Sequence, residues 1–544
     1  MIKQFIFKFK ANNPINNFKN LNKKIFKSID GSGKILLEFN NWHPLHISFA
    51  YLANFLAENL KASIIAYPGY KLIVENLDNS FTKKIKFYLG KKLWLKTFGI
   101  YNSFGVNDII NLKIDKTIEK KALKKFHKIK KKIKTRRDIL NIKLENIEIG
   151  DLVYDTYLAK KKIPTIDPAE IEFQNFLQDT IKYFYFWKKY IENNNVKAII
   201  TSHSTYTIAI PLRIALKANI PSFVCKPSDI YRLTKKKYLC ETEFVDFRKK
   251  FNSLSQNEKS IGLKEAKRRI KLRLEGKIGV DMGYSSKSSF SQRKYSKKIL
   301  KKNNKIKVLI ATHCFLDAPN AIGKLLFSDF FEWLEFLGNF SKKTDYEWYI
   351  KSHPDFKVES YKILNKLLKK FPHIKLISPS TSHHQLKKEG INFALTCYGT
   401  IGFEYAMLGI PVINASVNNP HINYNFNFHP RNKKEYINLL KNLKKIKLKI
   451  NKKEIYEYYF MMHIFYTKNW LLNDLAKIEK KAGGFRKIYN EKIYDLFIKE
   501  FNTNKHNRIL KIIDNFIKSK EFRLSYKTAN FTIQDEIRKG RNIN

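Results

Sequence analysis

The sequence holds 544 residues, 44% of them hydrophobic, so the chain is long and apolar enough for two or three folded domains. Lys and Arg number 104 against 48 Asp and Glu, and this formal net charge of +56 draws the protein toward anionic surfaces. No zinc-finger spacing, RNP-like strand or basic zipper occurs, so we expect no nucleic-acid partner.

The compartment is predicted from what the sequence lacks. Its four cysteines have no paired spacing, which is typical of reduced thiols in a cytosolic protein. No run approaches the roughly 18 apolar residues of a membrane span, and the first residues lack the apolar core of a signal peptide. We therefore expect a cytoplasmic protein, which its charge could bring to the inner membrane face.

The chain begins with a polar lead-in, residues 1–30, and continues into a first Rossmann-like domain, residues 31–234. An apolar strand at 35–39, an amphipathic helix at 47–60 and a second strand at 62–67 form a βαβ unit. His43 and His46 fall between the first strand and the helix. This loop lies at the ligand edge of such a sheet, so His43 is a candidate for contact with substrate.

A strongly basic segment, residues 120–137, has the apolar spacing of a helix. One interpretation is a solvated helix that packs Leu123, Phe126, Ile129 and Ile133 inward. The other is attachment to anionic membrane lipid.

His203 is the second candidate in this domain. It follows the strand 196–201 and precedes a helix at 208–218 and a strand at 220–224. An imidazole that titrates near neutral pH suits deprotonation of a sugar hydroxyl, so we predict that His203 contacts the acceptor or acts as general base. A structural turn histidine is an equally good interpretation.

Residues 235–304 are charged and broken, which predicts a helical insertion and a linker. Five basic side chains there could reach phosphates or could simply be solvated: Lys267, Arg268, Arg269, Arg273 and Lys277.

The second Rossmann-like domain is predicted at 305–450, before C-terminal helices at 451–544. His313 ends its first strand. A later strand ends in the corner Lys351-Ser352-His353-Pro354, and Pro354 excludes helical geometry from the residue before it. Strand-end side chains lie where ligands bind in open α/β sheets.

The stretch from Phe393 to Asn414 reads as strand, turn, helix and strand. Gly399 permits close backbone approach, and the hydroxyl of Thr400 could face a phosphate at the helix start. Glu404 lies one turn further and could accept hydrogen bonds from sugar hydroxyls. Alternatively, Thr400 only caps the helix and Glu404 only balances its dipole. His421, in the loop that follows, is a predicted sugar contact.

The His-Pro corner and the segment YGTIGFEYAMLGIPVI resemble the donor-nucleotide domain of bacterial capsule and surface-polysaccharide biosynthesis proteins. Similar signatures occur in capsule Kdo transferases, bacterial sialyltransferases, UDP-N-acetylglucosamine 2-epimerases and teichoic acid glycerophosphotransferases. The resemblance covers about residues 305 to 430. It implies a B-type glycosyltransferase (GT-B) fold, in which His353, Thr400 and Glu404 contact the donor nucleotide. Several relatives have a Ser-Ser or Ser-Thr pair at the Thr-Ile-Gly-Phe-Glu segment, which leaves the donor open.

We therefore expect an α/β fold of two facing Rossmann-like domains with a helical insertion and C-terminal helices. The expected activity is glycosyl transfer from a nucleotide-sugar to a surface polysaccharide or lipid-linked glycan. No metal is expected, and the nucleotide-sugar is a co-substrate rather than a cofactor. The predicted donor-side residues are Lys351, His353, His313, Tyr398, Gly399, Thr400, Glu404 and His421.

Other functions remain open at this point. One is a nucleotide-sugar 2-epimerase on the same fold. Another is a membrane-surface scaffold of polysaccharide assembly that has lost catalysis. A nucleic-acid binder rests on charge alone.

Overall fold

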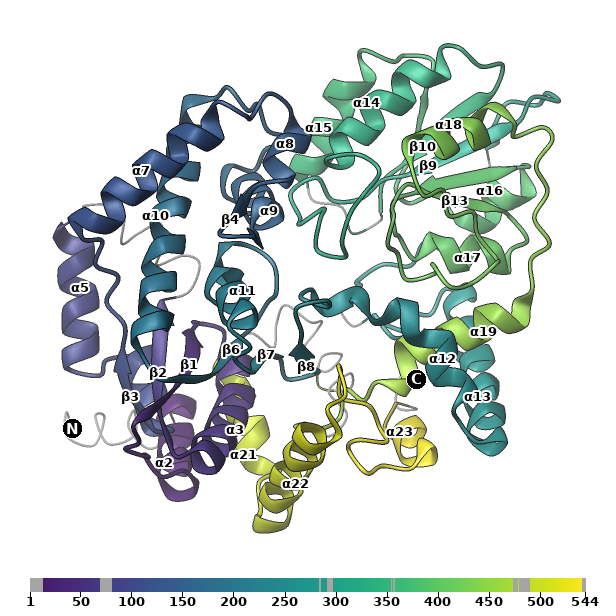
Figure 1. The fold of residues 1–544 in the computed structure, drawn as a ribbon. Coiled ribbons are helices and arrows are strands. Elements are labelled where there is room, and N and C mark those ends of the chain that lie inside the picture. Colours follow the sequence, from purple (N-terminus) through teal and green to yellow (C-terminus); the bar gives the residue numbers. More distant parts are fainter. Residues whose placement is uncertain are drawn as a thin grey trace, which may run out of the picture.

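The computed structural model describes residues 13–68, 81–282, 285–290, 297–353, 355, 358–472, 478 and 490–540. It contains two α/β domains joined by a helical insertion, with the last helices returning beneath the N-terminal domain (Figure 1). The predicted fold, two facing Rossmann-like domains with a helical insertion and C-terminal helices, is confirmed. The predicted domain boundaries remain a prediction.

The N-terminal domain is built on a six-stranded sheet of order β3-β2-β1-β6-β7-β8, parallel except for β8 at the edge. Leu36 of β1 packs into one apolar layer, whereas Ile35 and Leu37 pack into the other, so helices cover both faces. The strands are β1 (Gly33–Phe39), β2 (Ala62–Pro68), β3 (Val106–Ile109), β6 (Val196–Thr201), β7 (Ser222–Cys225) and β8 (Ile230–Leu233).

Helices surround this sheet, and a short antiparallel hairpin joins two of them. The helices are α2 (Pro14–Ile25), α3 (His43–Leu60), α5 (Phe81–Lys92), α6 (Thr97–Ser103), α7 (Lys116–Lys130), α8 (Arg136–Leu140), α9 (Gly150–Lys161), α10 (Ile171–Asn193) and α11 (Ile210–Lys217), and the hairpin strands are β4 (Lys143–Leu144) and β5 (Ile147–Glu148).

The C-terminal domain has a fully parallel five-stranded sheet of order β11-β10-β9-β12-β13. Its strands are β9 (Lys307–Ala311), β10 (Glu347–Lys351), β11 (Lys375–Ile377), β12 (Phe393–Thr396) and β13 (Val412–Asn414). Its helices are α14 (Phe330–Ser341), α15 (Val358–Leu368), α16 (His383–Lys388), α17 (Ile401–Met407) and α18 (Lys433–Lys441).

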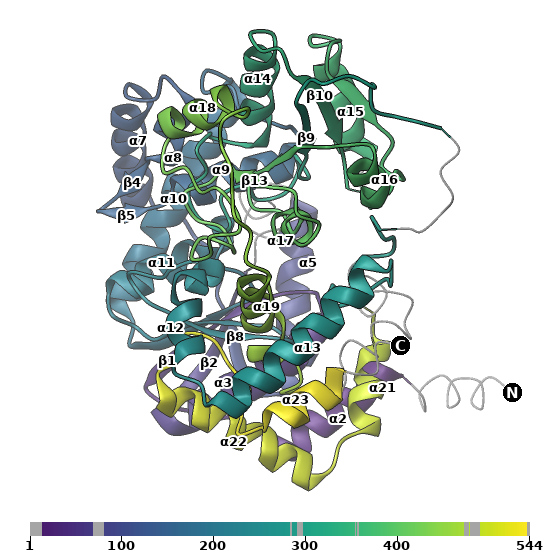
Figure 2. The same ribbon diagram turned by 90° about the vertical axis from the view of Figure 1, so that its right-hand side faces the viewer.

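The insertion and the tail tie the domains together. Helix α13 packs against α19 and α23, while α21 and α22 pack against α3 of the N-terminal domain (Figure 2). These elements are the 3-10 segment Cys240–Asp246, α12 (Phe247–Asn252), α13 (Gln256–Leu274), α19 (Lys452–Phe460), the π-helical turn Met461–Phe465, α21 (Lys492–Lys499), α22 (Thr503–Ser519) and α23 (Ile533–Gly540).

A polar interface connects the domains directly. The Tyr154 hydroxyl donates to the Asp329 carboxylate at 2.5 Å, and the Asn320 side-chain amide donates to Asp155 at 2.8 Å. All four residues are buried, so these bonds hold α9 against the loop before α14.

Two local expectations were wrong. Helix α3 begins at His43 rather than 47, because Pro44 fits a first helical turn, so His43 and His46 are helical. The basic segment is two helices, since a capping box at Thr135 starts α8 anew. The polar lead-in, for which no element was predicted, contains α2.

Candidate functional site

The C-terminal sheet has its topological switch point between β9 and β12. From β9 the chain proceeds outward to β10 and β11, and β12 and β13 then extend the other side. In open parallel sheets the crevice at such a point binds ligands. A cavity of about 740 Å³ lies here and is lined by His313, which follows β9, and by Tyr398, Gly399 and Thr400, which follow β12.

His313 is locked into this crevice. Its ring stacks on Phe330 at 4.6 Å, and its Nε2 lies 3.0 Å from the Thr396 hydroxyl and accepts weakly from the Cys397 amide at 3.3 Å. Because Nε2 accepts from a backbone N–H, the neutral ring carries its proton on Nδ1. Burial lowers the pKa of His313 to about 4, and His353 adds to this. His313 therefore offers a fixed Nδ1–H donor at pH 7.

Gly399 is needed for the packing of the crevice more than for contact with a ligand. Its amide donates to the Thr396 hydroxyl at 3.1 Å, and a Cβ here would lie 2.9 Å from the same oxygen. Thr400 is the residue before α17, but it is in helical conformation and its side chain makes no capping bond. Its hydroxyl has no hydrogen-bond partner among the residues that the structure describes. The alternative in which Thr400 only caps the helix is therefore wrong.

Lys351 ends β10 and is 3% exposed. Its ammonium has no carboxylate within ion-pair distance and no hydrogen-bond partner within the described ranges. Desolvation lowers the pKa of Lys351 to about 8, and Glu404 partly opposes this. A buried cation without a counter-charge is costly, so an anionic ligand in the cavity would relieve the cost.

His353 is exposed at the rim of the cavity, where its Nδ1 accepts the Asp355 amide at 3.0 Å. Its neutral ring therefore carries the proton on Nε2. The other half of the predicted corner, Pro354, lies outside the described residues.

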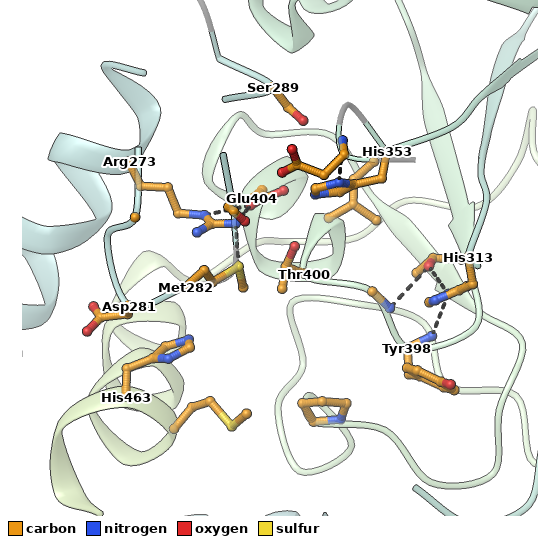
Figure 3. Close-up of a pocket in the computed structure, with 18 of the residues that line it drawn as sticks. Arg273, Asp281, Met282, Ser289, His313, His353, Tyr398, Thr400, Glu404 and His463 are labelled. Atoms are coloured by element: carbon orange, nitrogen blue, oxygen red, sulfur yellow. Dashed lines mark hydrogen bonds and ion pairs between the residues drawn. The ribbon is translucent and has the colours of Figure 1, made fainter. Parts of the chain in front are cut away.

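Glu404 is 4% exposed and is paired with Arg273 of α13, with Nε 2.7 Å and Nη2 2.6 Å from one carboxylate oxygen. Figure 3 shows this pair on one side of Thr400, and His313 with Tyr398 on the other. The insertion thus closes over the cavity side of the C-terminal domain. Arg273, which the sequence left as a phosphate contact or a solvated side chain, is neither in this structure.

Two more buried ion pairs line the same cavity. Arg269 contacts Asp281 at 2.7 Å, and Arg523 of the tail contacts Asp229 at 2.5 Å. The arginines hold the pKa of both aspartates at about 2, against the opposing effect of burial. Asp229 follows β7, so the carboxyl edge of the N-terminal sheet also reaches the cavity.

The N-terminal switch point lies between β1 and β6 and is closed by its own side chains. Glu38 is 3% exposed and accepts the Ser202 amide at 2.5 Å, the Ser202 hydroxyl at 3.0 Å and the Asn40 amide at 2.7 Å. The Ser202 hydroxyl also lies 2.7 Å from His203 Nδ1. Burial, with a contribution from Lys226, lowers the pKa of His203 to about 3, far from the near-neutral value predicted.

Three predicted contacts lie apart from the cavity lining. His203 packs beside the exposed Trp42 ring, with ring centroids 5.7 Å apart. His43 packs in the first turn of α3 against Tyr494, ring centroids 5.4 Å apart. His421 is fully buried behind α17, where a Cβ on Gly402 would lie 2.4 Å from its ring. Within the described residues neither ring nitrogen of His421 has a hydrogen-bond partner, and this buried ring is not part of the cavity lining.

Sequence reasoning missed several lining residues. Lys226 directly follows β7, and that strand end was a usable signal. Asp281, His463 and Arg523 come from the insertion and the tail, where no local pattern indicates a site. The packing of α13 and α19 brings Asp281 and His463 to the cavity, and a bridge between Tyr231 of β8 and Arg523 places the third.

Two observations concern the described residues alone. Within them, no three His, Cys, Asp or Glu side chains gather as a metal site requires. No helix among them is long and apolar enough to cross a membrane.

Comparison with known proteins gives little beyond these observations. No protein-family model and no curated protein matches the chain. Among solved structures, the UDP-GlcNAc 2-epimerase from Methanocaldococcus jannaschii is 11% identical, covers 77% of this chain and 94% of its own, and has a TM-score of 0.24. A glycosyltransferase from Rickettsia africae ESF-5 is 12% identical over 90% and 100%, with a TM-score of 0.22. The wall teichoic acid polymerase TagF is 12% identical over 95% and 96%, with a TM-score of 0.19. These low scores carry no weight for function, and the fold rests on the topology above.

Proposed function

We propose that this chain is a glycosyltransferase that binds a nucleotide-sugar in the cavity at the C-terminal switch point. Lys351 carries the proposal, because its buried ammonium has no counter-charge in the described structure. A diphosphate would supply that charge, and a cavity of about 740 Å³ is of ordinary size for such a ligand. The acceptor would be a surface polysaccharide or lipid-linked glycan on the N-terminal domain.

In this proposal each residue on the donor side has a separate role. Lys351 neutralises the phosphate charge that develops as the nucleotide leaves. The Nδ1–H of His313 and the hydroxyl of Thr400 donate hydrogen bonds, because neither has its donor engaged elsewhere in the described residues. Glu404 stays paired with Arg273 through one carboxylate oxygen, and its other oxygen can accept a hydrogen bond from the sugar.

On the acceptor side, His203 and His43 remain predictions. The neutral His203 ring can accept a hydrogen bond from a sugar hydroxyl. A role as general base requires its pKa to rise when acceptor binds, since a value of about 3 makes a weak base. The proposal also keeps the nucleotide-sugar as co-substrate, with no resident metal, and attraction to an anionic membrane.

A thermal-shift screen against CMP, CDP, UDP, GDP and their sugars tests the donor site. Lys351→Met is the diagnostic variant and Lys267→Met, on the exposed side of α13, is the matched control. One nucleotide at about 100 times its Kd should stabilise wild type and Lys267→Met by about 2.7 kcal/mol, with the effect lost in Lys351→Met. No shift from any nucleotide would contradict the proposal and favour the non-catalytic scaffold.

The nucleotide-sugar that stabilises the protein in this screen can then be used to distinguish a transferase from an epimerase. Incubation without acceptor, followed by NMR of the sugar, should leave its configuration at C2 unchanged. A C2-inverted nucleotide-sugar would replace the transferase with an epimerase on the same fold.

A further inference from the structure

The N-terminal domain exposes an unusual run of large apolar side chains on and just after α5. Five residues within eleven positions are between 40% and 60% exposed: Ile85, Tyr88, Leu89, Leu93 and Leu95. We name these five the α5 patch. Single exposed apolar residues need no explanation, but a group this dense on a folded protein marks an interaction surface.

The opposite side of α5 fixes it to the domain. Phe87 packs edge-on against Phe98, with ring centroids 5.6 Å apart, and a Cβ on Gly90 would lie 2.7 Å from the Phe98 ring. Ile85, Tyr88 and Leu89 have i, i+3, i+4 spacing, so they share the outward face. Their exposure therefore follows from how the helix is seated.

The turn after α5 continues the patch. Trp94 and Lys96 both have positive φ, 47° and 49°. Trp94 is half-buried against the core, while Leu93 and Leu95 on either side of it are 59% and 48% exposed. Such backbone costs about 1–2 kcal/mol per residue, so the outward placement of these leucines is held by the surrounding structure.

Lysines surround this apolar face. Residues 81–97 hold six Lys and no acidic residue, and Lys86, Lys92 and Lys96 are exposed. The Lys92 ammonium lies 5.8 Å from the Tyr88 ring centroid. In Figure 1 helix α7, like α5, lies at the left of the N-terminal domain, opposite the C-terminal domain. Residues 116–130 there hold seven Lys and one acidic residue.

We propose that the α5 patch docks the protein onto an anionic lipid bilayer, with α5 lying in the interface. Apolar side chains among lysines match acyl chains below anionic headgroups. A second copy fits poorly, because apposed patches would bring their lysines together at a net charge of +56 per chain. At 12 residues, α5 extends about 18 Å and is too short to cross a bilayer.

Vesicle flotation of the full chain tests this surface without any nucleotide, so its outcome is independent of the donor-site proposal. The probes are vesicles of phosphatidylcholine alone and of phosphatidylcholine with phosphatidylglycerol. Wild type should float only with the anionic vesicles and should retain part of that binding in high salt. A triple variant, Tyr88→Ser with Leu89→Ser and Leu93→Ser, should lose binding about tenfold or more.

The matched control changes equally exposed apolar residues elsewhere. Ile171→Ser with Ile278→Ser and Val358→Ser, at 74%, 53% and 61% exposure, should float like wild type. Unchanged melting temperatures would exclude unfolding of either triple variant. Equal binding by wild type and the α5 triple variant at every salt concentration would overturn the proposal, and so would loss of a wild-type dimer in the triple variant by light scattering.

Discussion

The two Rossmann-like sheets have the same arrangement at their switch points, but their polar groups differ in whether they have hydrogen-bond partners. In each, a histidine at a strand end lies within hydrogen-bond distance of a hydroxyl at a strand end, His203 with Ser202 and His313 with Thr396. At the N-terminal point the neighbouring Glu38 consumes the remaining donors. At the C-terminal point, within the described residues, the Lys351 ammonium and the Thr400 hydroxyl have no hydrogen-bond or ion-pair partner.

This difference separates a structural strand end from a binding one. A buried polar group that is already satisfied gains little from a ligand, whereas an unsatisfied one gains a hydrogen bond and a counter-charge. The C-terminal point therefore carries the stronger evidence for a ligand, although the sequence patterns of the two units look alike.

The largest expected effect on stability is that of removing Glu404. Of the two buried glutamates at the switch points, Glu38 and Glu404, only Glu404 has a cationic partner. Glu404→Ala leaves the Arg273 guanidinium, whose side chain is 14% exposed, without its carboxylate. We expect a loss of about 3–5 kcal/mol in the free energy of unfolding, measured by urea denaturation. The double variant with Arg273→Leu should recover part of the loss. A loss below that of Glu38→Ala would contradict the role given to the pair.

Lys351→Met should act in the opposite direction. Because the folded-state pKa of Lys351 is lowered to about 8 from 10.5, its charged form opposes folding at pH 7. Its removal should raise the free energy of unfolding by on the order of 3 kcal/mol. The unfolded state binds the extra proton between about pH 8 and 10.5, so the penalty is full below pH 8 and fades as the pH rises through that window.

Denaturation of both proteins at about pH 7 and at about pH 10.5 checks this pH dependence, with Lys267→Met as the exposed control. Equal stability of wild type and Lys351→Met at pH 7 would mean that the ammonium already has a counter-charge in the free protein.

Glu38→Ala should cost less, about 2 kcal/mol, because it leaves the Ser202 amide and neighbouring neutral donors unsatisfied rather than a charge. Nucleotide-dependent thermal shifts should stay as in wild type, since Glu38 lies at the N-terminal point. A lost nucleotide shift in a folded Glu38→Ala protein would show that the two switch points are coupled.

Most of the fold, and part of the difference between the two switch points, could be predicted from the sequence. Buried strands such as Val196–Thr201 and Phe393–Thr396 are visible as apolar runs, and strand-end residues such as His203 follow from them. The pairing of Glu404 with Arg273 was out of reach, because it joins residues 131 apart through the packing of an insertion. The burial of His421 likewise depends on Gly402 in a different element.

The variant with the smallest expected effect on stability distinguishes the two switch points best. Thr400→Val should change the free energy of unfolding by less than about 0.5 kcal/mol, because the hydroxyl caps nothing. The matching N-terminal change, Ser202→Ala, should cost about 1 kcal/mol, since it removes a hydroxyl that bonds Glu38. Titration of the nucleotide by calorimetry should give the reverse order, about fivefold to tenfold weaker binding for Thr400→Val and none lost for Ser202→Ala. Equal nucleotide affinities in the two variants would place the ligand away from Thr400, because a hydroxyl that neither caps nor binds has no reason to matter in either measurement.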